Sequence, residues 1–201
     1  MSVYKNQIQF ILGSSSCRRE KMLHQIGIKP DLIVKPEINE LVLKKELPIT
    51  YLKRVTQSKL NYVKSKHPNS LILSADTIVS VGRRILDKTC KIDIAEKYLT
   101  LLSGRRHRVV TGFSIVSPIF KQKMRYVTSV VRFKELSAQE INFYLESDEW
   151  KGKAGAYAIQ GIASRYINFI SGSYSNIVGL PLSEVYNMLV SAGYDFNNEN
   201  N

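Results

Sequence analysis

Asp76 and Thr77 are the residues whose types and position best suit chemistry. They lie within the segment from Ser74 to Val79, which completes a mostly apolar run of the kind that predicts a buried, central strand. A carboxylate at the end of such a strand can orient a water molecule or help to hold a metal ion. The simpler alternative is that Asp76 only forms a turn, a common role for aspartate at a strand end.

A second segment brings positive charge to a helix start. Residues Gly13 to Arg19 read GSSSCRR, a loop of small residues that runs into the apolar pattern of a helix. Unpaired N–H groups and the helix dipole attract anions there, and the forks of Arg18 and Arg19 suit bidentate contacts with phosphate. The spacing of a Walker loop is absent, and serines before a helix also serve as simple caps. Combined with Asp76, this segment predicts a polyphosphate site, in which cations neutralise spread negative charge.

Other reactive side chains fit catalysis less well. Cys17 lies at the helix start, but the Cys-x5-Arg pattern of a phosphatase would need arginine where the chain has Leu23, and no general base is evident. His107 follows a helix stop and is typical of a local hydrogen-bonding histidine. For a metal ion, Glu40 and Asp76 are the better candidates, because Mg²⁺ prefers carboxylate oxygen, water and substrate phosphate.

Length, charge and composition restrict the class. The chain has 201 residues, 44% of them hydrophobic, which suits one domain or two small lobes around one site. Its two cysteines give no disulfide framework, and no apolar run reaches the roughly 20 residues of a membrane span. The start lacks a signal-peptide core, so we expect a cytoplasmic protein with no membrane partner. The net charge of +12 predicts an anionic partner, and because Lys and Arg are scattered, a nucleotide is favoured over nucleic acid.

Strand and helix patterns alternate and predict an α/β sheet with mixed strand directions. Strands are expected over residues 7–12, 31–34, 70–81, 108–116 and 125–133. Helices are expected over residues 18–25, 50–64 and 183–190, and Thr50 is the expected cap of the second. Two more helices are expected to begin at capping boxes, one at Asp93 with Glu96 and one at residues 137–140. Residues 82–84 indicate a turn, 118–123 link a hairpin, and 196–201 form a frayed tail. Residues 150–182 lack periodicity, which is typical of long structured loops that carry function.

Taken together, the motifs resemble those of the Maf family of nucleoside triphosphate pyrophosphatases. The five matching segments are Leu12 to Arg19, Ser74 to Val79, Leu102 to Thr111, Lys153 to Gly161, and Gly172 to Tyr174 with Val178 to Leu182. They occur in the family's order, between Ile11 and about Leu189. The resemblance implies a two-lobed, strongly curved mixed β-sheet flanked by helices, as in inosine-triphosphatase-like enzymes. It further implies a single domain over residues 1–201 and a homodimer.

By the same resemblance, the chain hydrolyses a nucleoside triphosphate to the monophosphate and pyrophosphate with a divalent metal cation, Mg²⁺ or Mn²⁺. Asp76 takes the role of proton acceptor. The implied substrate-binding residues are Ser16, Arg18, Arg19, Lys59, Thr77, Lys88, Lys153 and Gln160, and the implied metal ligands are Glu40 and Asp76. Four local departures are Cys17 in place of proline, Asn39 beside Glu40 in place of an acid, Ser74 in place of glycine, and Thr89 in place of proline. Asn39 bears on the metal assignment, because a missing carboxylate weakens cation binding.

We expect Asp76 to orient and deprotonate a water that attacks the α-phosphorus, directly or as a metal-bound hydroxide. The side chains that neutralise the leaving pyrophosphate are Arg18, Arg19, Lys59 and Lys88. The same cations should keep the pKa of Asp76 low, so that it remains an ionised base.

Gln160 indicates which base is read. Its amide offers a donor and an acceptor, which match the ring N–H and carbonyl of uracil or thymine. Glutamate there would suit guanine's edge, as in the family branch that prefers 7-methyl-GTP. The expected substrates are therefore dTTP and UTP, with 7-methyl-GTP as the alternative. Two further alternatives are that Gln160 only binds its own loop, and that the chain is a nucleic-acid- or nucleotide-binding growth regulator without turnover.

Overall fold

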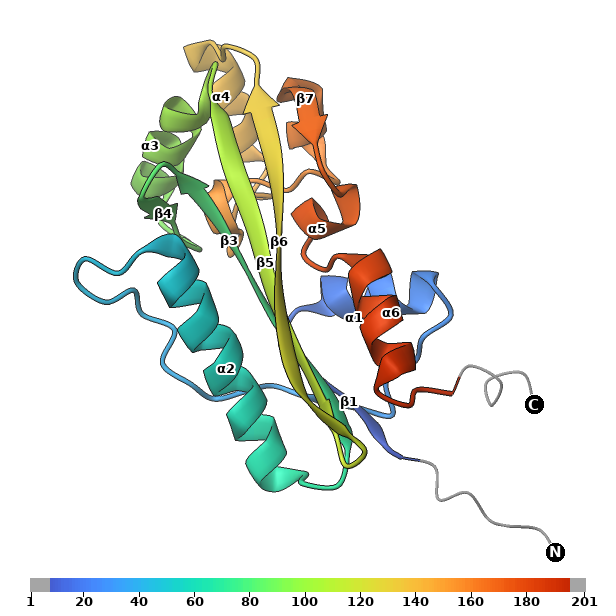
Figure 1. Cartoon of the computed structure of the whole chain (residues 1–201). Coiled ribbons are helices and arrows are strands. Elements are labelled where there is room, and N and C mark those ends of the chain that lie inside the picture. Colours follow the sequence, from blue (N-terminus) through green and yellow to red (C-terminus); the bar gives the residue numbers. More distant parts are fainter. Residues whose placement is uncertain (1–7, 196–201) are drawn as a thin grey trace, which may run out of the picture.

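The computed structural model describes residues 8–195, and its centre is one seven-stranded mixed sheet (Figure 1). Six strands lie in the order β2-β1-β3-β5-β6-β7, and β4 pairs with β3. The strands are β1 (Phe10–Gly13), β2 (Leu32–Val34), β3 (Leu71–Val81), β4 (Arg84–Leu86), β5 (Arg106–Ser117), β6 (Phe120–Phe133) and β7 (Ile167–Ser171). The predicted residue 7 of the first strand and the predicted tail at 196–201 lie outside the described residues.

Strand directions are mixed, as predicted. β1 runs parallel to β2 and to β3, whereas β4 and β5 are antiparallel to β3, and β6 and β7 continue that antiparallel order. The helices are α1 (Cys17–Gln25), α2 (Pro48–Lys66), α3 (Ile92–Leu102), α4 (Ala138–Glu146), α5 (Tyr174–Val178) and α6 (Leu182–Ser191), with 3-10 turns at Ala154–Ala156 and Ile162–Tyr166. Within residues 8–195, no helix is long and apolar enough to cross a membrane.

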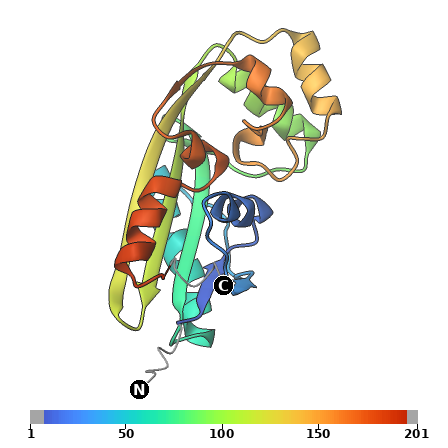
Figure 2. The same ribbon diagram turned by 90° about the vertical axis from the view of Figure 1, so that its right-hand side faces the viewer.

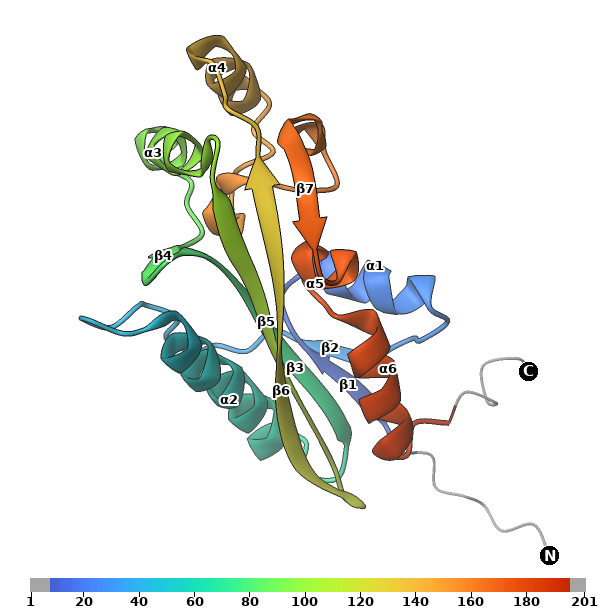
Figure 3. The ribbon, with the colours of Figure 1, turned by 45° about the horizontal axis from the view of Figure 1, so that its top comes forward.

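The helices cover the two faces of the sheet unequally. Side chains from α1, α3, α4 and α6 join the largest apolar core on one face, whereas α2 packs on the other. Figure 3 shows α2 on one side of the sheet and α1 with α6 on the opposite side. In Figure 2, α3 (green) and α4 (yellow-orange) lie beside the same face of the sheet's upper part. β3 is buried on both faces and therefore reads as an apolar strand.

Alternation along β3 decides which face each side chain meets. Leu73 and Ala75 belong to the largest core, whereas Ile72 and Ile78 pack with residues of α2. Successive side chains of a strand point to opposite faces. Asp76 therefore points toward α2, and its neighbour Thr77 points the other way.

Two of the three expected helix caps are wrong. α2 begins at Pro48, two residues before the predicted cap Thr50, because proline has no N–H to leave unpaired in a first turn. α3 begins at Ile92, and no side chain caps it, so the capping box expected from Asp93 is absent. The box at Ser137 is confirmed, since its hydroxyl accepts from the Glu140 N–H and Glu140 accepts from the Ser137 N–H.

The hairpin is longer than predicted, and the loop region contains regular structure. β5 and β6 are joined only by Pro118 and Ile119, so most of the expected 118–123 link belongs to β6. Its alternating lysines are the exposed side of that strand. The turn expected at 82–84 leads into β4, and the aperiodic region 150–182 contains β7 and α5, elements too short to impose a period on the sequence.

Gly112 lets α2 approach the sheet, and this contact predicts a stability effect. A Cβ built at Gly112 would lie 2.9 Å from the Thr56 hydroxyl and 3.0 Å from the Leu52 side chain. We expect Gly112→Ala to lower the free energy of unfolding by about 2 kcal/mol, measured by urea denaturation, because a packed core resists added volume. The exposed Thr128→Ala on β6 is the control, with an effect within about 0.5 kcal/mol. Equal effects of the two substitutions would contradict close packing at this contact.

Candidate active site

The Asp76 carboxylate forms a buried ion pair with Lys59. Asp76 on β3 is 2% exposed and Lys59 on α2 is 4% exposed. The Lys59 Nζ donates to Asp76 Oδ1 over 2.7 Å. Lys59 lies one turn from Val63 and Val55, which hold α2 against the sheet. The packing of α2 therefore determines where the ammonium meets the carboxylate.

Two more residues extend this pair into a cluster of alternating charge. Lys59 Nζ also lies 3.0 Å from Glu40 Oε1. Lys88, in the segment after β4, places its Nζ 3.4 Å from Glu40 Oε2 and 4.0 Å from Asp76 Oδ1. Two carboxylates and two ammonium groups thus share one cluster, contributed by the loop after β2, by α2, by β3 and by the segment after β4. We call these four residues the ion cluster.

The ion cluster sets the charge state of Asp76. Burial by itself raises the pKa of Asp76, but Lys59, Lys88 and Arg19 together outweigh burial and hold the pKa below its ordinary value. Asp76 is therefore an ionised carboxylate at neutral pH, as the sequence predicts. Asp87 is a third acid close enough to feel this charge. Burial raises its pKa most, and the charges of Asp76 and Glu40 raise it further.

On the opposite face of β3, Arg19 connects distant parts of the chain. It is 6% exposed. Its Nε donates to the Gly179 carbonyl over 2.9 Å, Nη1 to Ser14 Oγ over 2.9 Å, and Nη2 to Thr77 Oγ1 over 3.0 Å. The Thr77 hydroxyl also pairs with that of Thr111 on β5 over 2.9 Å. Three of the five N–H groups of Arg19 thus hold protein groups, so this arginine builds the wall of the site.

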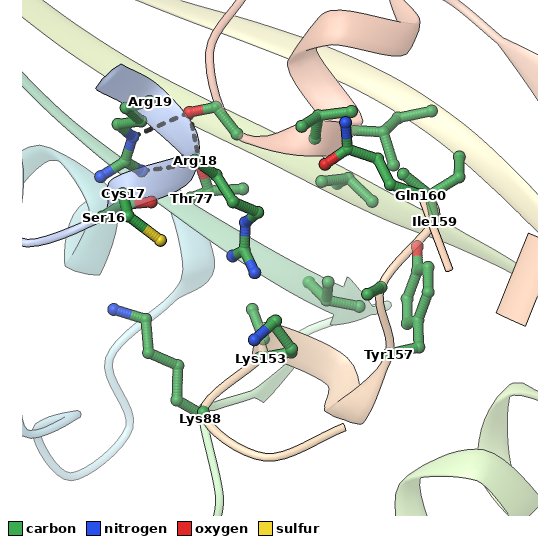
Figure 4. A pocket seen from close by; sticks show the side chains of 18 of the residues that line it. Ser16, Cys17, Arg18, Arg19, Thr77, Lys88, Lys153, Tyr157, Ile159 and Gln160 are labelled. Carbon is green, nitrogen blue, oxygen red and sulfur yellow. Dashed lines mark hydrogen bonds between the residues drawn. The ribbon is translucent and has the colours of Figure 1, made fainter. Parts of the chain in front are cut away.

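A cavity of about 290 Å³ opens beside Arg19 and Thr77. One side carries the cations Arg18, Lys88 and Lys153. In Figure 4 the charged ends of Arg18 and Lys153 lie close to one another, whereas the Lys88 ammonium points away from them. Burial, and then the charge of Arg18, lowers the pKa of Lys153. The other side is mostly apolar and ends in the exposed Gln160; its lining includes Val79, Val109, Tyr157, Ile159, Ile177 and Val178.

The structure brings the predicted site residues together in two groups. Those that line the cavity are Ser16, Arg18, Arg19, Thr77, Lys88, Lys153 and Gln160. Those that lie in the ion cluster are Glu40, Lys59, Asp76 and again Lys88. Lys88 belongs to both groups and joins them. Asp76 itself is outside the cavity lining, because strand alternation turns it toward α2.

The apolar wall contains residues that sequence reasoning did not assign to the site. Tyr157 is buried beside His107, with 2.8 Å between its hydroxyl and His107 Nε2. Burial lowers the pKa of His107 to about 4, so this histidine is neutral at physiological pH. Its hydrogen bond to Tyr157 joins residues 50 positions apart, so this side-chain contact is not the local one that its place after a helix stop predicts. The only sequence signal for Tyr157 was its place in the segment Lys153 to Gly161.

The two carboxylates of the ion cluster have the chemistry that a divalent cation requires. Glu40 and Asp76 both contact the Lys59 ammonium, so an oxygen atom of each carboxylate lies within 3.0 Å of the same nitrogen. Carboxylate oxygen is the preferred protein ligand of Mg²⁺, which takes its other ligands from water and phosphate. Within the part of the chain that the structure describes, no group of three or more His, Cys, Asp or Glu side chains forms a complete protein cage. The residues therefore fit a cation that a substrate shares.

Comparison with known proteins agrees with the motifs. The family model described as Maf-like protein matches residues 9–192, so the chain belongs to the Maf-like family. A relative named dTTP/UTP pyrophosphatase, from Wolbachia sp. subsp. Drosophila simulans (strain wRi), is 49% identical over 93% of this chain and 94% of its own length. A relative from Ehrlichia canis (strain Jake), named nucleoside triphosphate pyrophosphatase, is 49% identical over 89% of this chain and 93% of its own.

A solved structure also overlaps in part. The Staphylococcus aureus Ham1 protein is 14% identical and superposes with a TM-score of 0.39 over 62% of this chain and 71% of its own.

The buried pair predicts a pH-dependent stability effect of Lys59→Met. At pH 7 we expect the free energy of unfolding to fall by about 3 kcal/mol, because the substitution leaves a buried carboxylate without its bonded cation. Wild-type Asp76 has a depressed pKa, so its stabilising contribution is present at neutral pH and is lost as the pH falls through the folded-state pKa. In the variant, the Lys59 charge no longer opposes the effect of burial, so the pKa of Asp76 rises. The deficit should therefore shrink as the pH falls from 7 toward the ordinary aspartate value of 3.8.

Urea titrations at several pH values measure this deficit. The control is Lys53→Met, which removes an exposed lysine from the same helix and should change the free energy of unfolding by less than about 0.5 kcal/mol. A deficit for Lys59→Met that stays constant with pH would contradict the assigned pairing.

Proposed function

We propose that this chain hydrolyses nucleoside triphosphates, with dTTP and UTP as substrates, to the monophosphate and pyrophosphate. The observation that carries the proposal is a cavity with two unlike ends, next to a buried ionised acid. Three cations face one end, an apolar wall with Gln160 lies at the other, and Lys88 links the cavity to Asp76. The names of the relatives at 49% identity support the same activity. The single two-lobed domain and the homodimer implied by the motifs stay predictions, and so does the cytoplasmic location.

The triphosphate binds with its phosphates against Arg18, Lys88 and Lys153. These side chains line the cavity, whereas most of the hydrogen bonds of Arg19 go to the protein. Arg19 then acts mainly by holding Thr77 in place and by contributing positive charge near the phosphates. The wall around Tyr157 and Ile159 receives the nucleoside, because an apolar surface suits a flat base.

Asp76 acts as the general base once a substrate has drawn Lys88 away. In the free protein the Lys88 ammonium lies between the cavity and the carboxylate, and its side chain is 45% exposed and able to move. Triphosphate oxygens compete for this ammonium because they carry more charge than the shared carboxylates. Departure of the Lys88 ammonium lets a water reach Asp76 from the phosphate end. Asp76 orients that water and accepts its proton, while Lys59 keeps the acid ionised beforehand.

Glu40 and Asp76 would hold a divalent cation together with phosphate oxygens of the substrate. When bound, such a cation neutralises the charge that develops on the leaving pyrophosphate. Asn39 next to Glu40 accepts the Leu41 N–H through its side-chain oxygen, so it supports the loop that carries Glu40.

Gln160 reads the base. Its side chain is exposed at the cavity and makes no hydrogen bond with residues 8–195, so its donor and acceptor are available for a ligand. This disfavours the alternative in which Gln160 only binds its own loop. A pyrimidine offers a carbonyl and a ring N–H at the spacing of one amide.

Asp76→Asn tests the catalytic assignment. The purified wild type should release pyrophosphate from UTP and dTTP with a divalent cation present. The variant should lose about 10³-fold in kcat, the usual contribution of a general base, while it remains folded and binds UTP. Asp93→Asn, on the exposed side of α3, is the matched control and should keep wild-type turnover.

Two outcomes would redirect the proposal. An Asp76→Asn variant that keeps more than about a tenth of the wild-type kcat would show that another group is the base. A wild type that releases pyrophosphate from none of a screen of common and modified triphosphates, and that binds DNA with a steep salt dependence, would favour the nucleic-acid alternative.

Gln160→Glu tests base reading. A carboxylate only accepts hydrogen bonds, so it should repel the carbonyl edge of uracil and pair with the N–H groups of guanine. We expect kcat/KM for UTP to fall by at least about tenfold and the value for 7-methyl-GTP to rise. Gln139→Glu is the control, because it makes the same charge change at an exposed position of α4 that does not line the cavity. An unchanged preference in the Gln160 variant would defeat this assignment.

A further inference from the structure

The segment that carries Gln160 is held from outside the cavity. The Ala158 N–H donates to the Tyr144 hydroxyl of α4 over 3.1 Å. The Ile162 N–H donates to Glu149 Oε2 over 2.7 Å. These two anchors lie two residues before and two residues after Gln160. Since the Gln160 amide has no hydrogen bond of its own within the described residues, the anchored backbone sets its position.

The Glu149 carboxylate packs against Gly161, in addition to its hydrogen bond with the Ile162 N–H. A Cβ built at Gly161 would collide with all three atoms of the Glu149 carboxylate group. The carboxylate thus occupies the space directly beside the backbone that follows Gln160. Only glycine at position 161 permits this approach. The contact joins the turn after α4 to the base-reading end of the cavity, although Glu149 itself is absent from the cavity lining.

We propose that Glu149 is a positioning residue that sets base selectivity by holding the Gln160 backbone at the depth that suits a pyrimidine. This inference rests on the proposed function of the cavity. Glu149 acts through the Ile162 N–H and the backbone of Gly161, and it contacts no substrate atom. Its exchange for a side chain that cannot accept a hydrogen bond frees the backbone beyond Gln160.

The depth of the cavity connects this anchor to the choice of base. The phosphate end is fixed by Arg18 and Lys153, and the opposite end is fixed by the Gln160 segment. A purine is longer than a pyrimidine by one ring, so it needs the segment to retreat. Release of the Glu149 anchor permits that retreat, and it simultaneously moves the Gln160 amide away from a bound uracil. UTP should lose affinity while GTP is excluded less.

The test compares Glu149→Ala with Glu149→Gln. The ratio of kcat/KM for UTP to that for GTP should fall by about tenfold in Glu149→Ala, mainly through a higher KM for UTP. Glu149→Gln keeps an oxygen that accepts from the Ile162 N–H, so its ratio should stay within about threefold of wild type. Glu149→Asp, whose shorter side chain falls short of that N–H, should behave like Glu149→Ala and replaces it if the alanine variant does not fold.

Glu146→Ala is the matched control. It removes the same charge from an exposed position three residues earlier and should leave the ratio unchanged. A merely structural role for Glu149 would lower turnover of UTP and GTP equally or shift only the melting temperature. An unchanged ratio in both Glu149→Ala and Glu149→Asp overturns the proposal, and so does loss of selectivity in Glu149→Gln equal to that in Glu149→Ala.

The proposed function and this inference fail separately. If the wild type hydrolyses UTP and the Glu149 variants keep its selectivity, only the positioning role is wrong. If the wild type hydrolyses neither nucleotide, the proposed function is wrong. The dissociation constants for UTP and GTP in an Asp76→Asn background still test the positioning role, because their ratio requires no turnover.

Discussion

The buried pair between Asp76 and Lys59 is the interaction on which the site depends. A carboxylate that is 2% exposed can stay ionised only beside a cation, and Lys59 supplies that cation from α2 at 2.7 Å. Because the same ammonium contacts Glu40 at 3.0 Å, it also fixes the loop after β2 against the sheet. The catalytic assignment and the packing of α2 therefore rest on one contact, and neither can change without the other.

Strand alternation then separates the acid from the cavity. Asp76 and Thr77 are neighbours in β3, yet one faces α2 and the other faces Arg19. Lys88 spans the two sides, since it lines the cavity and its ammonium lies 4.0 Å from the carboxylate. In the free protein the Asp76 carboxylate is thus buried behind Lys59 and Lys88, and the proposed function requires an arriving triphosphate to draw Lys88 away.

The sequence predicted the strand directions and the grouping of the charged residues better than the boundaries of the helices. Mixed strand directions, the buried strand around Asp76 and the cluster of cations follow from local patterns, and all three are present. The start of α2 was missed because a proline in the first turn replaces a side-chain cap. The anchors at Tyr144 and Glu149 leave no local pattern at all, because each contact joins residues more than ten positions apart. Side-chain alternation was available in the sequence, but only the packed helices show which face each residue meets.

The bond between Arg19 and the Gly179 carbonyl joins residues 160 positions apart. A ribosome adds residues from the amino end, so a chain that is still being made holds its arginines, lysines and acid long before it holds that carbonyl. Until Gly179 has been added, the wall beside Thr77 lacks a side. A growing chain therefore cannot form the complete pocket before that residue emerges from the ribosome.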